Sequence, residues 1–92
     1  MTDSEINLAI AKLEYPDRDW LFLKDGSIAH GYDYCNMWSD IGPIIERERI
    51  ELTIFRSEWC AGGYNLYFTT TAETPTKAAA LCYLKIIGFY DG

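Results

Sequence analysis

The first apolar pattern along the chain is that of an amphipathic helix. Four apolar residues occupy the positions i, i+3, i+4 and i+7, and they are Ile6, Ala9, Ile10 and Leu13. Thr2 stands three residues before Glu5, a separation at which the two side chains can cap each other's backbone N–H groups. Pro16 ends the pattern, because the residue before a proline is pushed out of the α region. These signals predict a helix over residues 3–14.

A second helical pattern lies in the middle of the chain. Its apolar positions are Trp38, Ile41, Ile44 and Ile45. They predict a helix over 40–49, with Ser39 or Asp40 as the N-cap and with Pro43 confined to the first turn. An alternating run of charges, from Glu46 to Arg49, occupies the outward face, as is usual for a solvated helix surface.

A third helical pattern closes the chain. Thr74 and Pro75 have the order of an N-cap followed by the first helical residue. The apolar residues behind them form one stripe, which consists of Ala80, Leu81, Leu84 and Ile87. Gly88 provides a left-handed stop. The prediction is a helix over 75–87.

Two further regions read as β-hairpins. Short apolar runs flank the pair at 25–26, which is Asp-Gly, and predict strands over 19–24 and 27–31 joined by a tight turn. Period-two alternation marks the second region, first at Ile50, Leu52 and Ile54 and then at Tyr64, Leu66 and Phe68. The glycine pair at 62–63 suits a turn between these strands, although the pair does not fix where the turn falls.

The predicted order of elements is therefore αββαββα. With 92 residues and no break in composition, the chain is expected to form a single α+β domain over residues 1–92. Hairpins pair antiparallel, so we expect a four-stranded antiparallel sheet with helices packed on it. Apolar side chains on both strand faces suggest that the helices partly cover both sides of the sheet.

Charge narrows the choice of partner. The chain carries 14 acidic and 8 basic residues, a net charge of −6, and the excess lies in residues 1–46, with nine acids against three bases. A negative field disfavours binding to free nucleic acid and to anionic membranes, and it favours cationic partners. The alternative is that this charge only keeps a small domain in solution.

Catalytic and metal-binding patterns are weak in this sequence. Three cysteines without a CxxC pair indicate neither a disulfide framework nor zinc ligands, and the start of the chain does not resemble a signal peptide. His30, Asp33 and Cys35 could be taken for metal ligands or for parts of a cysteine dyad, but their spacing fits neither kind of site well. The glycine pair at 62–63 lacks the lysine of a phosphate loop. We predict no enzyme activity, no cofactor and no metal.

A cluster of aromatic and acidic residues in the middle of the chain is more informative. It comprises Tyr32, Asp33, Tyr34, Trp38 and Asp40. Tyrosine and tryptophan are favoured at interface hot spots, because they bury a large area at modest entropic cost. The alternative is that these side chains surround the core with their polar groups in water.

Three segments of the chain have a familiar combination: INLAIA in the first helix, DYCNMWSD before the second, and TPTKAAALCYL in the third. Together they resemble the phage ABA-sandwich domain family, whose members are small phage and prophage proteins. The resemblance covers most of the chain and departs from the family pattern between Arg56 and Gly63. The resemblance implies a bacteriophage accessory protein of the host bacterial cytoplasm. The chain is also similar to anti-CRISPR proteins that act on type I-F surveillance complexes.

The resemblance and the charge together predict a noncatalytic inhibitor that binds basic Cas subunits of a type I-F surveillance complex, near its guide RNA, and blocks recognition of target DNA. The predicted contact residues are Tyr32, Asp33, Tyr34, Asp40, Glu46, Glu48 and Glu51. We expect a monomer that binds neither free nucleic acid nor membrane. The alternative is a structural or regulatory phage protein that acts through self-association or through another protein partner.

Overall fold

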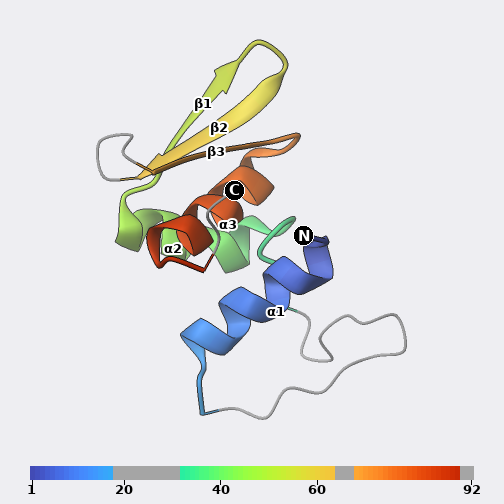
Figure 1. Ribbon diagram of the computed structural model, residues 1–92, viewed down its shortest axis with the longest axis vertical. Helices are drawn as coiled ribbons and strands as arrows, with labels where there is room; N and C mark the ends of the chain where they lie inside the picture. The colour runs from blue at the N-terminus through green and yellow to red at the C-terminus, as the bar shows by residue number, and fades with distance from the viewer. Residues whose placement is uncertain (18–31, 64–67, 90–92) are drawn as a thin grey trace.

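The computed structural model describes residues 1–17, 32–63 and 68–89 (Figure 1). This part of the chain forms an α+β domain with three helices and a three-stranded antiparallel sheet, in the order ααβββα. The elements are α1 (Asp3–Glu14), α2 (Trp38–Glu48), β1 (Glu51–Phe55), β2 (Glu58–Gly63), β3 (Phe68–Ala72) and α3 (Pro75–Ile86). The strands predicted over 19–24 and 27–31 lie outside the described residues.

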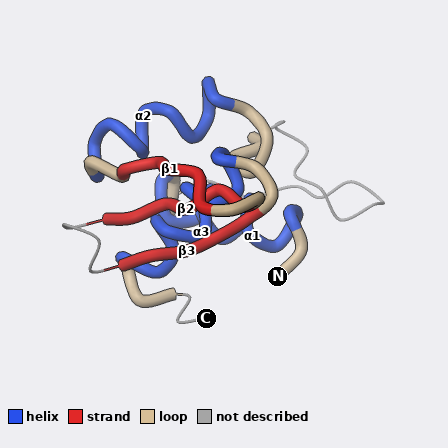
Figure 2. The backbone as a smooth tube through the Cα atoms, turned by 90° about the horizontal axis from the view of Figure 1, so that it is seen from above, coloured by secondary structure: helices blue, strands red, loops and turns tan. Residues whose placement is uncertain are grey.

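The described elements form layers, with α3 in the middle (Figures 1 and 2). One side of α3 packs against β2 and β3, and α1 and α2 pack against its other sides. All three described helices therefore lie on one side of the sheet, which corrects the expected cover of both faces. The opposite face carries exposed polar side chains such as Thr53, Thr69 and Thr71.

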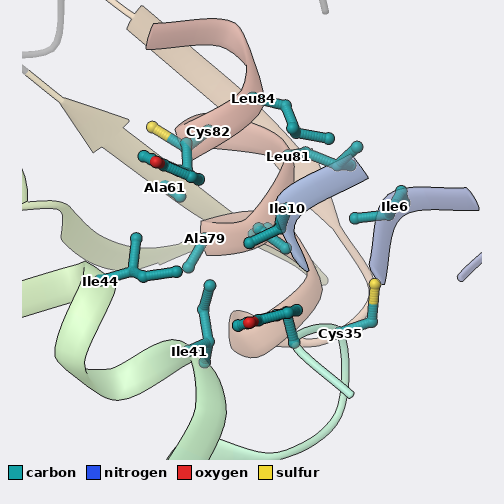
Figure 3. Close-up of a cluster of buried hydrophobic side chains, with 14 of the residues drawn as sticks. Ile6, Ile10, Cys35, Ile41, Ile44, Ala61, Ala79, Leu81, Cys82 and Leu84 are labelled. Atoms are coloured by element: carbon teal, nitrogen blue, oxygen red, sulfur yellow. The ribbon is translucent and has the colours of Figure 1, made fainter. Parts of the chain in front are cut away.

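The central position of α3 explains its composition. Eight of its residues are buried, and they are Thr76, Ala78, Ala79, Ala80, Leu81, Cys82, Tyr83 and Leu84. A helix with neighbours on several sides must be apolar and small around most of its circumference, rather than along the single stripe expected from the sequence. Figure 3 shows Ile10 from α1 and Ile41 and Ile44 from α2 gathered around it. Ile87, predicted to belong to the apolar stripe, lies beyond the helix and is exposed.

The hairpin turn between β1 and β2 differs from the prediction. Phe55 pairs with Glu58, so the turn falls at Arg56 and Ser57, and Arg56 adopts a positive φ of 59°. The predicted glycine pair lies inside β2 instead. Gly63 is needed there for close packing of the sheet on α3, because a Cβ atom at this position would lie 2.6 Å from Cδ1 of Ile86.

Helix α2 starts two residues earlier than predicted. Its N-cap is Met37, which provides no side-chain hydrogen bond, so neither of the two predicted caps is correct. Pro43 is therefore the sixth helical residue and lies beyond the first turn. The last helical residue is Glu48, and Arg49 is the C-cap. The left-handed conformation of Arg49 (φ 54°, ψ 47°) lets the N–H of Ile50 donate to the carbonyl of Ile45 at 3.0 Å.

The other two helices confirm the sequence signals. α1 begins with the predicted capping box between Thr2 and Glu5. α3 begins with Thr74 as N-cap and Pro75 as its first residue. Gly88 follows it with a φ of 82°, which is the predicted left-handed stop.

Candidate functional site

The segment before α2 forms a compact turn, which we call the Asp33 turn (residues 33–37). The carbonyl of Asp33 accepts hydrogen bonds from the backbone N–H groups of Asn36 (3.2 Å) and Met37 (2.9 Å). Its carboxylate also accepts the side-chain amide of Asn36 at 3.0 Å. Short polar side chains favour such local bonds over regular structure, so this sequence folds into a turn and not into a longer helix.

The Asp33 turn is attached to α1 by Asn7. The Asn7 side chain donates to Oδ1 of Asp33 at 3.0 Å and accepts the backbone N–H of Cys35 at 3.1 Å. Asn7 is buried, and the structure gives both ends of its amide a partner. This one side chain therefore fixes both the side chain and the backbone of the turn.

Two more hydrogen bonds attach the turn to the other helices. The Oγ1 atom of Thr76 in α3 donates to the carbonyl of Cys35 at 2.6 Å. The carboxylate of Asp40 in α2 accepts the backbone N–H of Asp33 at 2.9 Å. The turn is thus held on all three described helices by hydrogen bonds within the molecule.

Several predicted contact residues have roles inside this arrangement. Asp33 and Asp40 accept the hydrogen bonds just described. Tyr34 is buried in the core, and this burial raises the pKa of its hydroxyl well above its ordinary value. The ring of Tyr32 is partly buried and stacks between Tyr34 (centroids 5.8 Å apart) and Tyr15 (5.3 Å).

The large apolar side chains that are exposed in this region belong to the N-cap and the first residue of α2. Met37 is 50% exposed and Trp38 is 53% exposed. The sequence placed Trp38 both on the apolar stripe with Ile41 and in the aromatic and acidic cluster that suggested an interface, whereas no sequence signal pointed to Met37. These two roles of Trp38 cannot be distinguished from the sequence, because its exposure depends on how the Asp33 turn sits on α1 and α3.

The remaining predicted residues lie elsewhere. Glu46 and Glu48 belong to the last turn of α2, about 12 and about 15 Å along the helix from Trp38 at a rise of about 1.5 Å per residue. Glu51 begins β1. Glu46 and Glu51 are exposed, whereas the carboxylate of Glu48 accepts Nε of Arg47 at 2.8 Å. The seven residues therefore do not form one continuous patch.

Arg47 also joins the three helices at the end distant from the Asp33 turn. Its guanidinium donates two hydrogen bonds to the carboxylate of Glu14, at 2.8 and 3.1 Å, and the hydroxyl of Tyr83 donates to the same carboxylate at 2.9 Å. The bond from Arg47, and after it the bond from Tyr83, lowers the pKa of Glu14 below its ordinary value of 4.5, against the opposing effect of burial.

Replacing Glu14 with glutamine is therefore expected to lower the free energy of unfolding by roughly 1 kcal/mol at neutral pH. The folded state binds the Glu14 proton less tightly than the unfolded chain does. The stabilisation is thus complete above the ordinary pKa of 4.5 and is lost as the pH falls below it. Urea unfolding at a series of pH values should show the gap between wild type and Glu14→Gln closing in acid. A gap that is the same at every pH would contradict this role.

None of the three cysteines, all of which lie in the described part of the chain, forms a disulfide, and their surroundings differ. Cys35 and Cys82 are buried, and burial raises the pKa of Cys35 to about 12 and that of Cys82 to about 11. Neither thiol is activated as a nucleophile. Cys60 lies in β2 and is partly exposed. His30 lies outside the described residues.

Within residues 1–17, 32–63 and 68–89, no group of three or more histidine, cysteine, aspartate or glutamate side chains is placed to hold a metal ion. No helix in the same part of the chain is long and apolar enough to cross a membrane.

Comparison with known protein families gives a match over most of the chain. The family model described as "Bacteriophage P22, NinX" matches residues 1–86, so the chain belongs to this family. No curated protein and no solved structure gives a significant match. The family confirms the expectation of a small phage protein. It supports neither the ABA-sandwich assignment nor the anti-CRISPR assignment expected from the sequence.

Proposed function

We propose that this NinX-family protein acts without catalysis, by binding a protein partner through Met37 and Trp38. The observation that carries the proposal is the 53% exposure of Trp38 beside a turn that hydrogen bonds hold on three helices. A tryptophan in water gains more from a partner's pocket than almost any other side chain, because it carries a large apolar area.

The rigidity of the Asp33 turn supports this role. A binding residue on a flexible loop must lose conformational freedom when it binds, and that loss reduces the affinity. Met37 donates its backbone N–H to Asp33, and Trp38 is the first residue of α2. The backbone under both side chains is therefore already ordered, and less of the interaction energy is spent on ordering it.

The charge of the chain favours a cationic partner, because the chain has 14 acidic and 8 basic residues and so a net charge of −6. The finer form of the proposal keeps the partner expected from the sequence, namely basic Cas subunits of a type I-F surveillance complex. Such complexes hold guide and target in positively charged channels. Binding at such a surface would block target DNA by occlusion.

The test is a binding titration of the purified protein against a type I-F surveillance complex. Trp38→Ala should weaken binding by about 30-fold or more, the loss typical of a hot-spot residue. The matched control is Phe89→Ala, because Phe89 is 57% exposed and lies after α3. Urea unfolding should show that both variants remain folded.

The outcomes separate the binding site from the identity of the partner. If Trp38→Ala binds as wild type does, Trp38 is not a contact and the proposed site is wrong. If the wild-type protein does not bind the complex, the Cas partner is wrong. In that case, capture from a lysate that depends on Trp38 but not on Phe89 would support the site with a different partner.

A further inference from the structure

The strand β1 forms one edge of the described sheet, in which the strand order is β1-β2-β3 (Figure 2). Phe55 and Glu58 flank a two-residue turn and so form a hydrogen-bonded pair. Hydrogen-bonded and non-hydrogen-bonded pairs alternate along an antiparallel ladder. The backbone N–H and C=O groups of Leu52 and Ile54 therefore point away from β2, toward the outer edge.

This edge lacks most of the usual protection against pairing, and Glu51 is the one charged residue of the strand. Its register with β2 is continuous from Glu51 to Phe55, without a bulge, and the strand contains neither proline nor lysine. Figure 1 shows the hairpin extending away from the helices. Ile54, near its tip, is 62% exposed. An apolar side chain so placed is available to a neighbouring strand.

The sequence of β1 is complementary to itself in the antiparallel direction. When two copies are related by a twofold axis at Thr53, Leu52 of each copy lies opposite Ile54 of the other. These are the two residues whose backbone groups point outward, so the arrangement forms four hydrogen bonds between the copies. It also places the apolar side chains of Leu52 and Ile54 in contact on one face of the joined sheet.

The same register matches opposite charges. Glu51 of one copy lies opposite Phe55 of the other, and the guanidinium carbon of Arg56 lies 5.4 Å from the centre of the Phe55 ring within its own chain. Arg56 of each copy therefore comes close to Glu51 of the other. This charge complementarity favours a second copy of the chain over an unrelated apolar strand.

We propose that two copies of this protein associate through their β1 edges, in the register centred on Thr53, so that the described three-stranded sheets of the two copies join into one continuous sheet. The proposal replaces the monomer expected from the sequence and does not depend on Trp38. Five residues on each side make a small interface, so the dimer is a reversible one that dissociates on dilution.

The first test is sedimentation velocity of the full chain over a wide range of concentration. Wild type should change from monomer to dimer as the concentration rises. Ile54→Lys should need at least a tenfold higher concentration, because it places a charge in the paired strand. The matched control is Ile87→Lys, since Ile87 is also exposed (40%) but lies outside the sheet, and it should associate as wild type does. A wild type that remains monomeric, or equal weakening by both variants, overturns the proposal.

The second test exchanges the charges of Glu51 and Arg56 and so tests the proposed register between the two copies. Glu51→Arg and Arg56→Glu should each weaken association, because each places like charges together. The double variant restores the pair and should associate nearly as wild type does. Circular dichroism confirms that each variant is folded. A double variant that is no stronger than the single ones overturns the register. Trp38→Ala should dimerise normally, so a failure of the binding proposal is distinct from a failure of this one.

Discussion

Replacing Asn7 with alanine is expected to lower the free energy of unfolding by about 2 to 3 kcal/mol. The change removes the acceptor of the Cys35 N–H and one donor to the carboxylate of Asp33. Cys35 is buried, so the substitution leaves its N–H without this partner in a place that water does not readily reach. The loss of a whole buried partner costs more than the net value of an ordinary hydrogen bond.

Urea unfolding measures this loss, with Asn36→Ala as the matched control. Asn36 donates the same kind of amide to the same carboxylate, at 3.0 Å, but it is exposed. Its replacement should cost well under 1 kcal/mol, because the carboxylate can then be hydrated. Hydrogen exchange at the Cys35 amide should accelerate in Asn7→Ala more than in Asn36→Ala. Equal losses in the two variants would show that the Asp33 turn does not depend on Asn7.

Replacing Ile10 with alanine is expected to cost about 2 to 5 kcal/mol. Ile10 is completely buried, and Figure 3 shows its side chain between α1 and α3 near Ala79. Small residues along α3 allow the helices to approach closely, and they cannot expand to fill a cavity. The cost of the lost contacts is therefore increased by a void that relaxes little.

Leu13→Ala is the control, because Leu13 lies on the same helix and its side chain is exposed. The two substitutions change similar volumes and helix propensities, so the difference between their unfolding free energies isolates burial. Thermal or urea unfolding of both variants provides the comparison. A loss at Leu13 as large as that at Ile10 would mean that α1 packs differently from the arrangement described above.

The helices could be predicted from the sequence because their signals are local. Thr2 with Glu5, Thr74 with Pro75, and Gly88 each act on a single helix end, and the structure shows each in its expected role. Apolar spacing then gave the extent of α1 and α3 to within a residue or two. Such signals do not depend on what the helix packs against.

The strand β2 was not predicted, because its sequence is determined by packing against α3 and not by local conformational preference. Gly62 and Gly63 resemble a turn when read alone, yet they lie in β2, where Gly63 makes room for Ile86. The turn itself uses Arg56, a residue that rarely adopts a positive φ. Only the close approach of α3 to the sheet shows that the glycine pair belongs to a strand and not to a turn. That approach is set by residues far along the chain.

In the candidate site, too, some features could be predicted from the sequence and others depend on packing. The cluster around Asp33 was identified from composition, but its acidic groups were expected to face a partner and instead hold the turn on Asn7 and α2. The exposure of Trp38 follows from that attachment. A sequence pattern can count aromatic and acidic residues, but it does not show which of them have partners within the molecule.

The central place of α3 also governs the order in which this protein can be completed during synthesis. α3 is the last of the described elements to leave the ribosome, and it is the one against which the sheet and the other two helices pack. The bond between Tyr83 and Glu14, for example, joins residues 69 positions apart. The earlier segments emerge without the surface that buries them, so the domain cannot close until α3 has been translated. Its long-range contacts then close long loops, at an entropic cost that rises only slowly with loop length.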